Sequence, residues 1–190
     1  MMTRGPDRMP PIPKAQWTEA QKKAAAEFAA NRKQEVFGPF ALMLRSPEVM
    51  LRAMAMGDYM RYRTVLPPRL NELIILVTAR HWTQQFEWQV HQPAALQAGL
   101  HPDVVGAVAE GRRPDGMSDE ETIVHDFTTG LLRSQHVSDA VYAKAVARFG
   151  EQGVIDMVGV AGYYSFLSMM MNTARTPAPA NSTVPALVPL

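Results

Sequence analysis

The sequence contains no cysteine among its 190 residues. This absence excludes disulfide bonds, thiolate metal sites, iron–sulfur clusters and every mechanism that depends on a thiol within this chain. It also fits a reducing compartment. The first residues lack the apolar stretch of a secretory signal, because a polar start runs into the proline-rich residues 10–13. We therefore expect a cytoplasmic protein.

An excess of charge of either sign is also missing, since the formal net charge is +1. A balanced chain is not drawn electrostatically to nucleic acid or to an anionic membrane, so we expect neither as a partner. The longest apolar stretch, residues 154–171, contains one charged residue, Asp156, and has the length of a short membrane span. Its glycines, serines and paired tyrosines favour a buried helix in the core of a soluble oligomer.

No stretch shows the alternation of apolar and polar residues that is typical of strands, so we predict an all-α fold. Capping boxes at Thr18–Gln21 and Ser118–Glu121, together with prolines and glycines, mark helix ends. The predicted helices span about 18–36, 46–61, 68–81, 84–98, 102–110, 118–133, 138–149 and 152–174. Prolines near both ends predict an extended or disordered arm over 1–14, a helical domain over 15–175 and a Pro-rich arm over 176–190.

Glu72 is the first candidate for acid–base chemistry. In the helix after Pro68, the positions three, four and seven residues beyond Glu72 are all apolar, so its carboxylate lies on an apolar stripe. A buried carboxylate needs a partner or has a raised pKa, and both are common at active sites. The alternative is a structural ion pair with Arg69, one helical turn earlier.

Glu87 and His91 form a second candidate. Residues four positions apart share one helix face, so the two side chains are expected to hydrogen-bond. A carboxylate on one imidazole nitrogen fixes the tautomer and leaves the other nitrogen free for a proton or a ligand. The alternative is an ordinary Glu–His pair on the surface.

Four further histidines share no spacing with carboxylates that predicts a metal site: His81, His101, His125 and His136. The adjacent His125 and Asp126 are expected to face different ways on a helix. We find no glycine-rich phosphate loop and no H-E-x-x-H pattern, and we expect no metal and no other cofactor.

Arginines gather just before Glu72. Arg61-Tyr62-Arg63 and Arg69 either form an anion-binding mouth or lie in a solvated turn between helices. The sequence does not decide between these two interpretations.

Residues 66–100, LPPRLNELIILVTARHWTQQFEWQVHQPAALQAGL, resemble the core of the carboxymuconolactone decarboxylase family, which includes the alkyl hydroperoxidase D branch. The redox branch carries the motif E-x11-C-x2-C-x3-H. Glu72 and His91 occupy its first and last positions at the same spacing, while Gln84 and Glu87 stand where the cysteines would be. The resemblance implies an alkyl hydroperoxidase D-like helical bundle that assembles with copies of itself as trimers or hexamers.

The missing cysteines disfavour the peroxiredoxin-type activity that a family-level label suggests, because that cycle needs a thiolate. The decarboxylase branch needs only proton transfer and charge stabilisation. We therefore expect a lyase, or a related acid–base enzyme, that acts on a small lactone or oxo acid. In this hypothesis His91 donates the proton, Glu87 orients His91, and Glu72 is a second acid–base or relay group.

Four residues are expected to bind the substrate: Gln84, Trp88, Arg69 and Tyr62. Two alternatives stay open. One is a related isomerase, hydratase or hydrolase, and the other is a non-catalytic helical oligomer that binds a small ligand or a partner protein. A buried, connected cluster of Glu72, Glu87 and His91 beside a pocket favours an enzyme, whereas three side chains on separate surfaces favour a binding protein.

Overall fold

The computed structural model describes residues 5–189, and this part of the chain is helical with no strand. The prediction of an all-α fold is confirmed. After a short 3₁₀ helix (Lys14–Gln16), the helices are α1 Glu19–Arg32, α2 Pro39–Met43, α3 Pro47–Tyr62, α4 Pro68–His81, α5 Gln85–Gln97, α6 Pro102–Ala109, α7 Asp119–Ser134 and α8 Asp139–Ala174.

Local sequence signals set most helix boundaries. Both predicted capping boxes are present, with Thr18 paired to Gln21 and Ser118 paired to Glu121. Helices α3, α4 and α6 begin with proline, whose missing amide donor costs nothing in the first turn. Helix α1 ends at Arg32, earlier than predicted, because Lys33 adopts the left-handed conformation.

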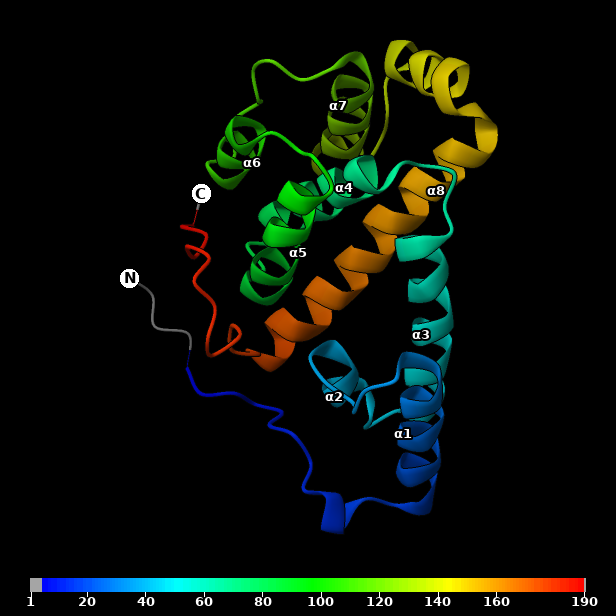
Figure 1. Ribbon diagram of the computed structural model, residues 1–190, viewed down its shortest axis with the longest axis vertical. Coiled ribbons are helices and arrows are strands. Elements are labelled where there is room, and N and C mark those ends of the chain that lie inside the picture. The colour runs from blue at the N-terminus through cyan, green and yellow to red at the C-terminus, as the bar shows by residue number, and fades with distance from the viewer. Residues whose placement is uncertain (1–4, 190) are drawn as a thin grey trace.

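Helix α4 is the centre of the core. It packs against α5, α7 and α8 (Figure 1), and every residue from Leu70 to Arg80 is buried. A helix that is apolar nearly all round must be covered on all sides, and this arrangement provides that cover. The polar residues that α4 carries into the core, Glu72 among them, therefore need partners from the helices around it.

Helix α8 crosses the molecule as one long element that bends near its start (Figure 1). The sequence predicts two helices here. The structure has two helical segments within α8 that meet at a kink at Gly150, whose φ of 69° and ψ of 175° are not helical, so this prediction is confirmed. Within the described residues α8 alone is long and apolar enough to span a membrane, but 56% of its apolar window is buried inside the fold. This burial is typical of a core helix.

Both ends of the described chain pack on the helical domain as extended segments (Figure 1). The Arg8 amide donates to the Ala174 carbonyl at 2.8 Å. At the other end, the side chain of Gln85 exchanges two hydrogen bonds with the backbone of Leu187, at 2.8 and 2.9 Å. Residues 1–4 of the predicted N-terminal arm lie outside the described residues.

Candidate acid–base site

Glu72, Glu87 and His91 meet where α4 packs against α5. Glu72 lies on α4, while Glu87 and His91 share one face of α5 because they are four residues apart. All three are buried, with exposed fractions of 8%, 3% and 2%. The structure thus connects the two candidates that the sequence analysis treats separately.

His91 lies between the two carboxyl groups. Its Nδ1 atom is 2.7 Å from Oε2 of Glu72, and its Nε2 atom is 3.5 Å from Oε2 of Glu87. The short contact makes Glu72 the acceptor for an Nδ1–H donor and leaves Nε2 facing Glu87. In the sequence-based hypothesis Glu87 orients the ring. In the structure the shorter contact of His91 is with Glu72. Because Glu72 lies on α4, the spacing of residues along α5 cannot predict this contact.

Glu87 has a buried carboxyl group in which one oxygen atom, Oε1, makes no hydrogen bond to the described residues. Burial raises the pKa of Glu87, while the charges of His91 and Arg61 act to lower that pKa and Glu72 acts to raise it further. A carboxyl group with a raised pKa beside an imidazole is well placed to hold a proton and to pass it on.

A small pocket of about 40 Å³ adjoins Glu87 and His91. Arg61 reaches it from α3, and Tyr164 reaches it from α8, where its ring packs edge-on against His91 at 5.0 Å between centroids. Burial raises the pKa of Tyr164 well above its usual value, so its hydroxyl group keeps its proton. The aromatic rings of Phe37 and Phe86 form part of the wall. A space of this size holds a few water molecules.

The residues predicted to bind substrate, Gln84, Arg69, Trp88 and Tyr62, do not line this pocket. Gln84 caps the start of α5, where its Oε1 atom accepts from the Phe86 amide at 2.6 Å. Arg69 forms ion pairs with Glu120 and Glu121 of α7 instead of pairing with Glu72. Both side chains therefore have structural partners outside the pocket.

Trp88 and Tyr62 also point elsewhere. Trp88 is buried and lines another pocket together with the C-terminal residues 184–188, and Tyr62 is 66% exposed. Their neighbour Arg61 is the cation at the pocket. Gly57 also lines the pocket and lies four residues before Arg61, so the two residues share one face of α3. This spacing is the sequence signal that distinguishes Arg61 from Tyr62 and Arg63 as the residue facing the pocket.

The prediction that His125 and Asp126 face different ways is wrong, because His125 Nδ1 lies 3.0 Å from Asp126 Oδ1. Neighbouring side chains on a helix can still meet when both bend toward the same space. Within residues 5–189, no three His, Asp or Glu side chains are grouped so as to hold a metal ion.

Residues 47–124 match the model of the carboxymuconolactone decarboxylase family. This segment includes Arg61, Glu72, Glu87 and His91, whereas Tyr164 lies beyond it. A comparison with curated protein sequences gave no significant match.

Several solved structures have a similar fold. The alkylhydroperoxidase AhpD core of a peroxidase-related protein from Ralstonia eutropha JMP134 is 16% identical with a TM-score of 0.74, covering 98% of this chain and 100% of that one. A variant of the debrominase Bmp8 bound to 2,3,4-tribromopyrrole is 12% identical with a TM-score of 0.68, covering 90% of each chain. A protein of unknown function from Agrobacterium tumefaciens is 14% identical with a TM-score of 0.60, covering 73% of this chain and 96% of that one.

These identities are low, so the solved structures establish the fold alone. Their agreement with the family match confirms the resemblance that the spacing of Glu72 and His91 predicts. Residues 47–124 of this cysteine-free chain match the carboxymuconolactone decarboxylase family, and the chain has an alkylhydroperoxidase D-like helical fold.

Proposed function

We propose that the protein is an acid–base enzyme that acts on a small lactone or oxo acid without thiol chemistry. The buried line of Glu72, His91 and Glu87 beside a pocket carries this proposal. Placing two carboxyl groups and an imidazole in the interior is costly unless they are paired, and the unpartnered Glu87 Oε1 leaves part of that cost unrelieved. Such an arrangement is more common at an active site than in a structural core.

In the proposed mechanism each group has one role. Glu72 accepts the Nδ1–H of His91 and holds the ring. Glu87 and the Nε2 atom of His91 exchange the proton with the substrate. Arg61, which forms no ion pair with the described residues, receives the substrate's carboxylate. Tyr164 excludes water from the far side of the ring.

For a carboxylated unsaturated lactone, the reaction is loss of carbon dioxide. The electrons of the breaking C–C bond move into the conjugated carbonyl and form an enolate. Glu87 or His91 then returns a proton to carbon, and the enzyme regains that proton from solvent. Other acid–base reactions, such as isomerisation, use the same proton transfer without breaking that bond. Because the chain has no cysteine, a thiol-dependent peroxidase cycle has no nucleophile here.

The pocket of about 40 Å³ is too small for a lactone ring. Substrate entry therefore requires its walls to move. Phe86 and Phe37 are the side chains proposed to move, because both line the pocket and Phe37 is 39% exposed, whereas α4 is held on all sides. The segment with Phe37 lies before the matched family segment.

The test is to incubate the protein in deuterated water with a panel of small unsaturated lactones and oxo acids and to follow deuterium incorporation and product formation by NMR. Glu87→Gln and His91→Gln are expected to lower the rate about 10²- to 10⁴-fold, the usual contribution of acid–base catalysis. Glu121→Gln is the matched control, because Glu121 is also buried but lies outside the pocket. Equal rates for Glu87→Gln and the wild type would overturn the proposal, and ligand binding without any exchange would support a non-catalytic binding protein instead.

A further inference from the structure

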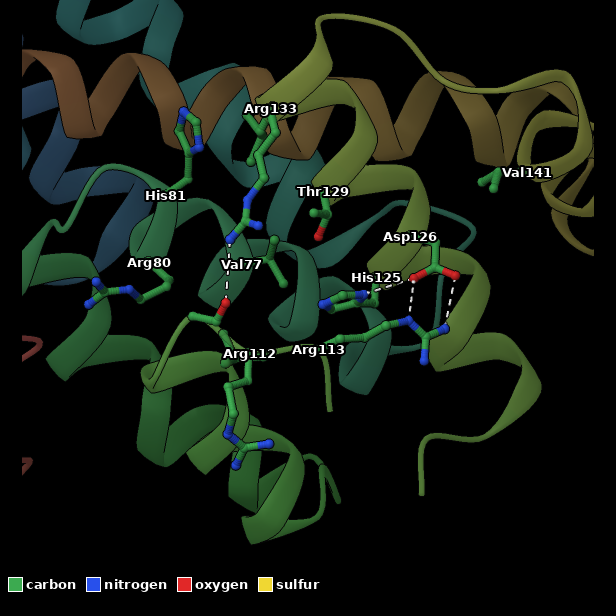
Figure 2. Close-up of a pocket in the computed structure, with 13 residues that line it drawn as sticks. Val77, Arg80, His81, Arg112, Arg113, His125, Asp126, Thr129, Arg133 and Val141 are labelled. Atoms are coloured by element: carbon green, nitrogen blue, oxygen red, sulfur yellow. Dashed lines mark hydrogen bonds and ion pairs between the residues drawn. The ribbon is translucent and has the colours of Figure 1, made fainter. Parts of the chain in front are cut away.

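A second and larger pocket, of about 480 Å³, lies among α4, α7 and the residues that follow α6 (Figure 2). None of its lining residues belongs to the pocket of Glu87 and His91. Its volume is within the usual range for small-molecule sites. Its wall combines apolar side chains such as Val77 and Leu132 with an unusual concentration of cationic ones.

The charges of this pocket are not balanced by its own residues. Four arginines line it, against a single carboxylate, Asp126. Both oxygens of Asp126 are already engaged by Arg113, at 3.2 and 3.0 Å. Arg133 has no carboxylate partner among the described residues, and its one hydrogen bond is to the Gly111 carbonyl at 3.4 Å. A guanidinium group without a counter-ion in a pocket favours binding of an oxyanion.

His125 adds a polar group with a fixed orientation. The residue is 7% exposed, and its Nδ1 atom is held 3.0 Å from Oδ1 of Asp126. In the tautomer whose Nδ1–H donates to Asp126, the Nε2 atom is a hydrogen-bond acceptor. Figure 2 shows the free edge of His125, the hydroxyl group of Thr129 and the guanidinium group of Arg133 around the same part of the pocket, over Val77.

The pocket contains one further histidine, His81. Burial lowers the pKa of His81, and the nearby charge of Arg133 lowers it further. Arg133 carries a permanent positive charge in the pocket, whereas His81 and His125 contribute ring nitrogens. An acceptor nitrogen beside an unpaired guanidinium group matches a ligand that carries a hydroxyl group next to a carboxylate.

We infer that this pocket binds a small hydroxy acid, whose carboxylate pairs with Arg133 and whose hydroxyl group donates to Nε2 of His125. Val77 and Leu132 contact the aliphatic part of the ligand. This site is separate from the acid–base site. Its test measures binding alone, so it stands or fails independently of any turnover by Glu87 and His91.

The experiment uses malate, succinate and inorganic phosphate as probes, with binding followed by calorimetry and by two-dimensional NMR of the histidine rings. Malate is expected to bind and to move the His125 signals while those of His91 stay in place. Succinate, which lacks the hydroxyl group, is expected to bind about 10-fold more weakly, the value of one good hydrogen bond. Dissociation constants for malate above about 10 mM, equal binding of malate and succinate, or binding of phosphate alone would each overturn the inference.

Three variants locate the interaction. Arg133→Gln is expected to weaken malate and succinate alike by about 10-fold or more, because both carboxylates lose their cation. His125→Phe keeps a ring of similar size and is expected to reduce malate to the level of succinate. Arg52→Gln is the matched control, since Arg52 is an exposed arginine paired with Glu48 outside the pocket. Equal weakening by Arg133→Gln and Arg52→Gln would mean that malate responds only to net charge, and the site assignment would be wrong.

Discussion

At the scale of single residues, the two glutamates of the acid–base site differ in their surroundings. Glu72 has a short contact with an imidazole N–H, whereas Glu87 has a longer contact and one oxygen without a partner among the described residues. Because the pKa of Glu87 is raised by burial, its proton is bound more tightly in the folded protein than in the unfolded chain. This difference has a direct consequence for the dependence of stability on pH.

We expect Glu87→Gln to stabilise the fold increasingly as the pH rises from about 4, the usual range of a free glutamate. At pH values between the unfolded and folded pKa of Glu87, the folded state binds more protons than the unfolded state. The free energy of unfolding of the wild type is therefore highest below the unfolded pKa and falls as the pH rises through this window. Each unit by which the pKa is raised costs about 1.4 kcal/mol at pH values above both. Urea unfolding of both proteins across this pH range measures the difference.

Glu121→Gln provides a control with the opposite sign. Burial acts to raise the pKa of Glu121, but hydrogen bonds from Ser118 and Arg69 outweigh it and lower that pKa overall. The stabilisation that Glu121 contributes is present above its unfolded pKa and is lost as pH falls. Its replacement should therefore cost most at neutral pH. The same pH trend in both variants would contradict the assignment of Glu87 as the group with the raised pKa.

The sequence is sufficient to find Glu72, Glu87 and His91, because spacing along a helix places each on an apolar or shared face. The sequence is not sufficient to assign which glutamate orients His91, since the short contact between His91 and Glu72 joins two different helices, α5 and α4. Tyr164 could not be identified in this way, because helices α6 and α7 separate it from His91 along the chain. Gln84 occupies a motif position, yet here its side chain caps a helix.

At the scale of helices, the close approach of α3 and α8 depends on a missing side chain. A Cβ atom at Gly57 of α3 would lie 2.7 Å from Cζ of Tyr163, which precedes the tyrosine that packs on His91. Only glycine lets the two helices meet at this distance without displacing that ring. Gly57 therefore helps to set how α8 lies against the site.

We expect Gly57→Ala to destabilise the protein by about 1–3 kcal/mol through overpacking, reduced by the gain of up to about 1 kcal/mol that alanine brings to a helix. Gly106→Ala is the matched control, because nothing lies within 4 Å of a Cβ atom at that helical position. The control should gain stability while Gly57→Ala loses it, as measured by urea unfolding. Equal gains in both variants would show that Tyr163 moves aside without cost.

Helix types and most boundaries follow from the sequence because proline, glycine and capping residues act locally, as at Pro68 and Ser118. One helix that the sequence does not predict has a physical reason for being missed. Helix α2 (Pro39–Met43) is too short to show a period. Gly150 is predicted to end a helix, and its non-helical backbone marks the kink where the two predicted helices meet within α8.

At the scale of the whole molecule, α8 leaves one apolar row uncovered. Ile155, Val158 and Met169 are 67%, 41% and 46% exposed. They lie on one side of the helix with Gly162, which has open space beside it. A row of this kind on an otherwise buried helix is typical of a surface that another subunit covers. It supports the expectation, drawn from the family resemblance, that the protein assembles as a trimer or hexamer.

We expect the wild-type protein to elute as an oligomer and Ile155→Asp to shift it toward the monomer, because a charge buried in an apolar interface has no partner there. Light scattering coupled to size-exclusion chromatography measures the mass of each species. Val188→Asp is the matched control, since Val188 is 73% exposed but lies on the C-terminal segment away from the row. It should leave the oligomer intact. A wild-type protein that stays monomeric at every concentration tested, or equal dissociation in both variants, would show that the α8 row is not the contact between subunits.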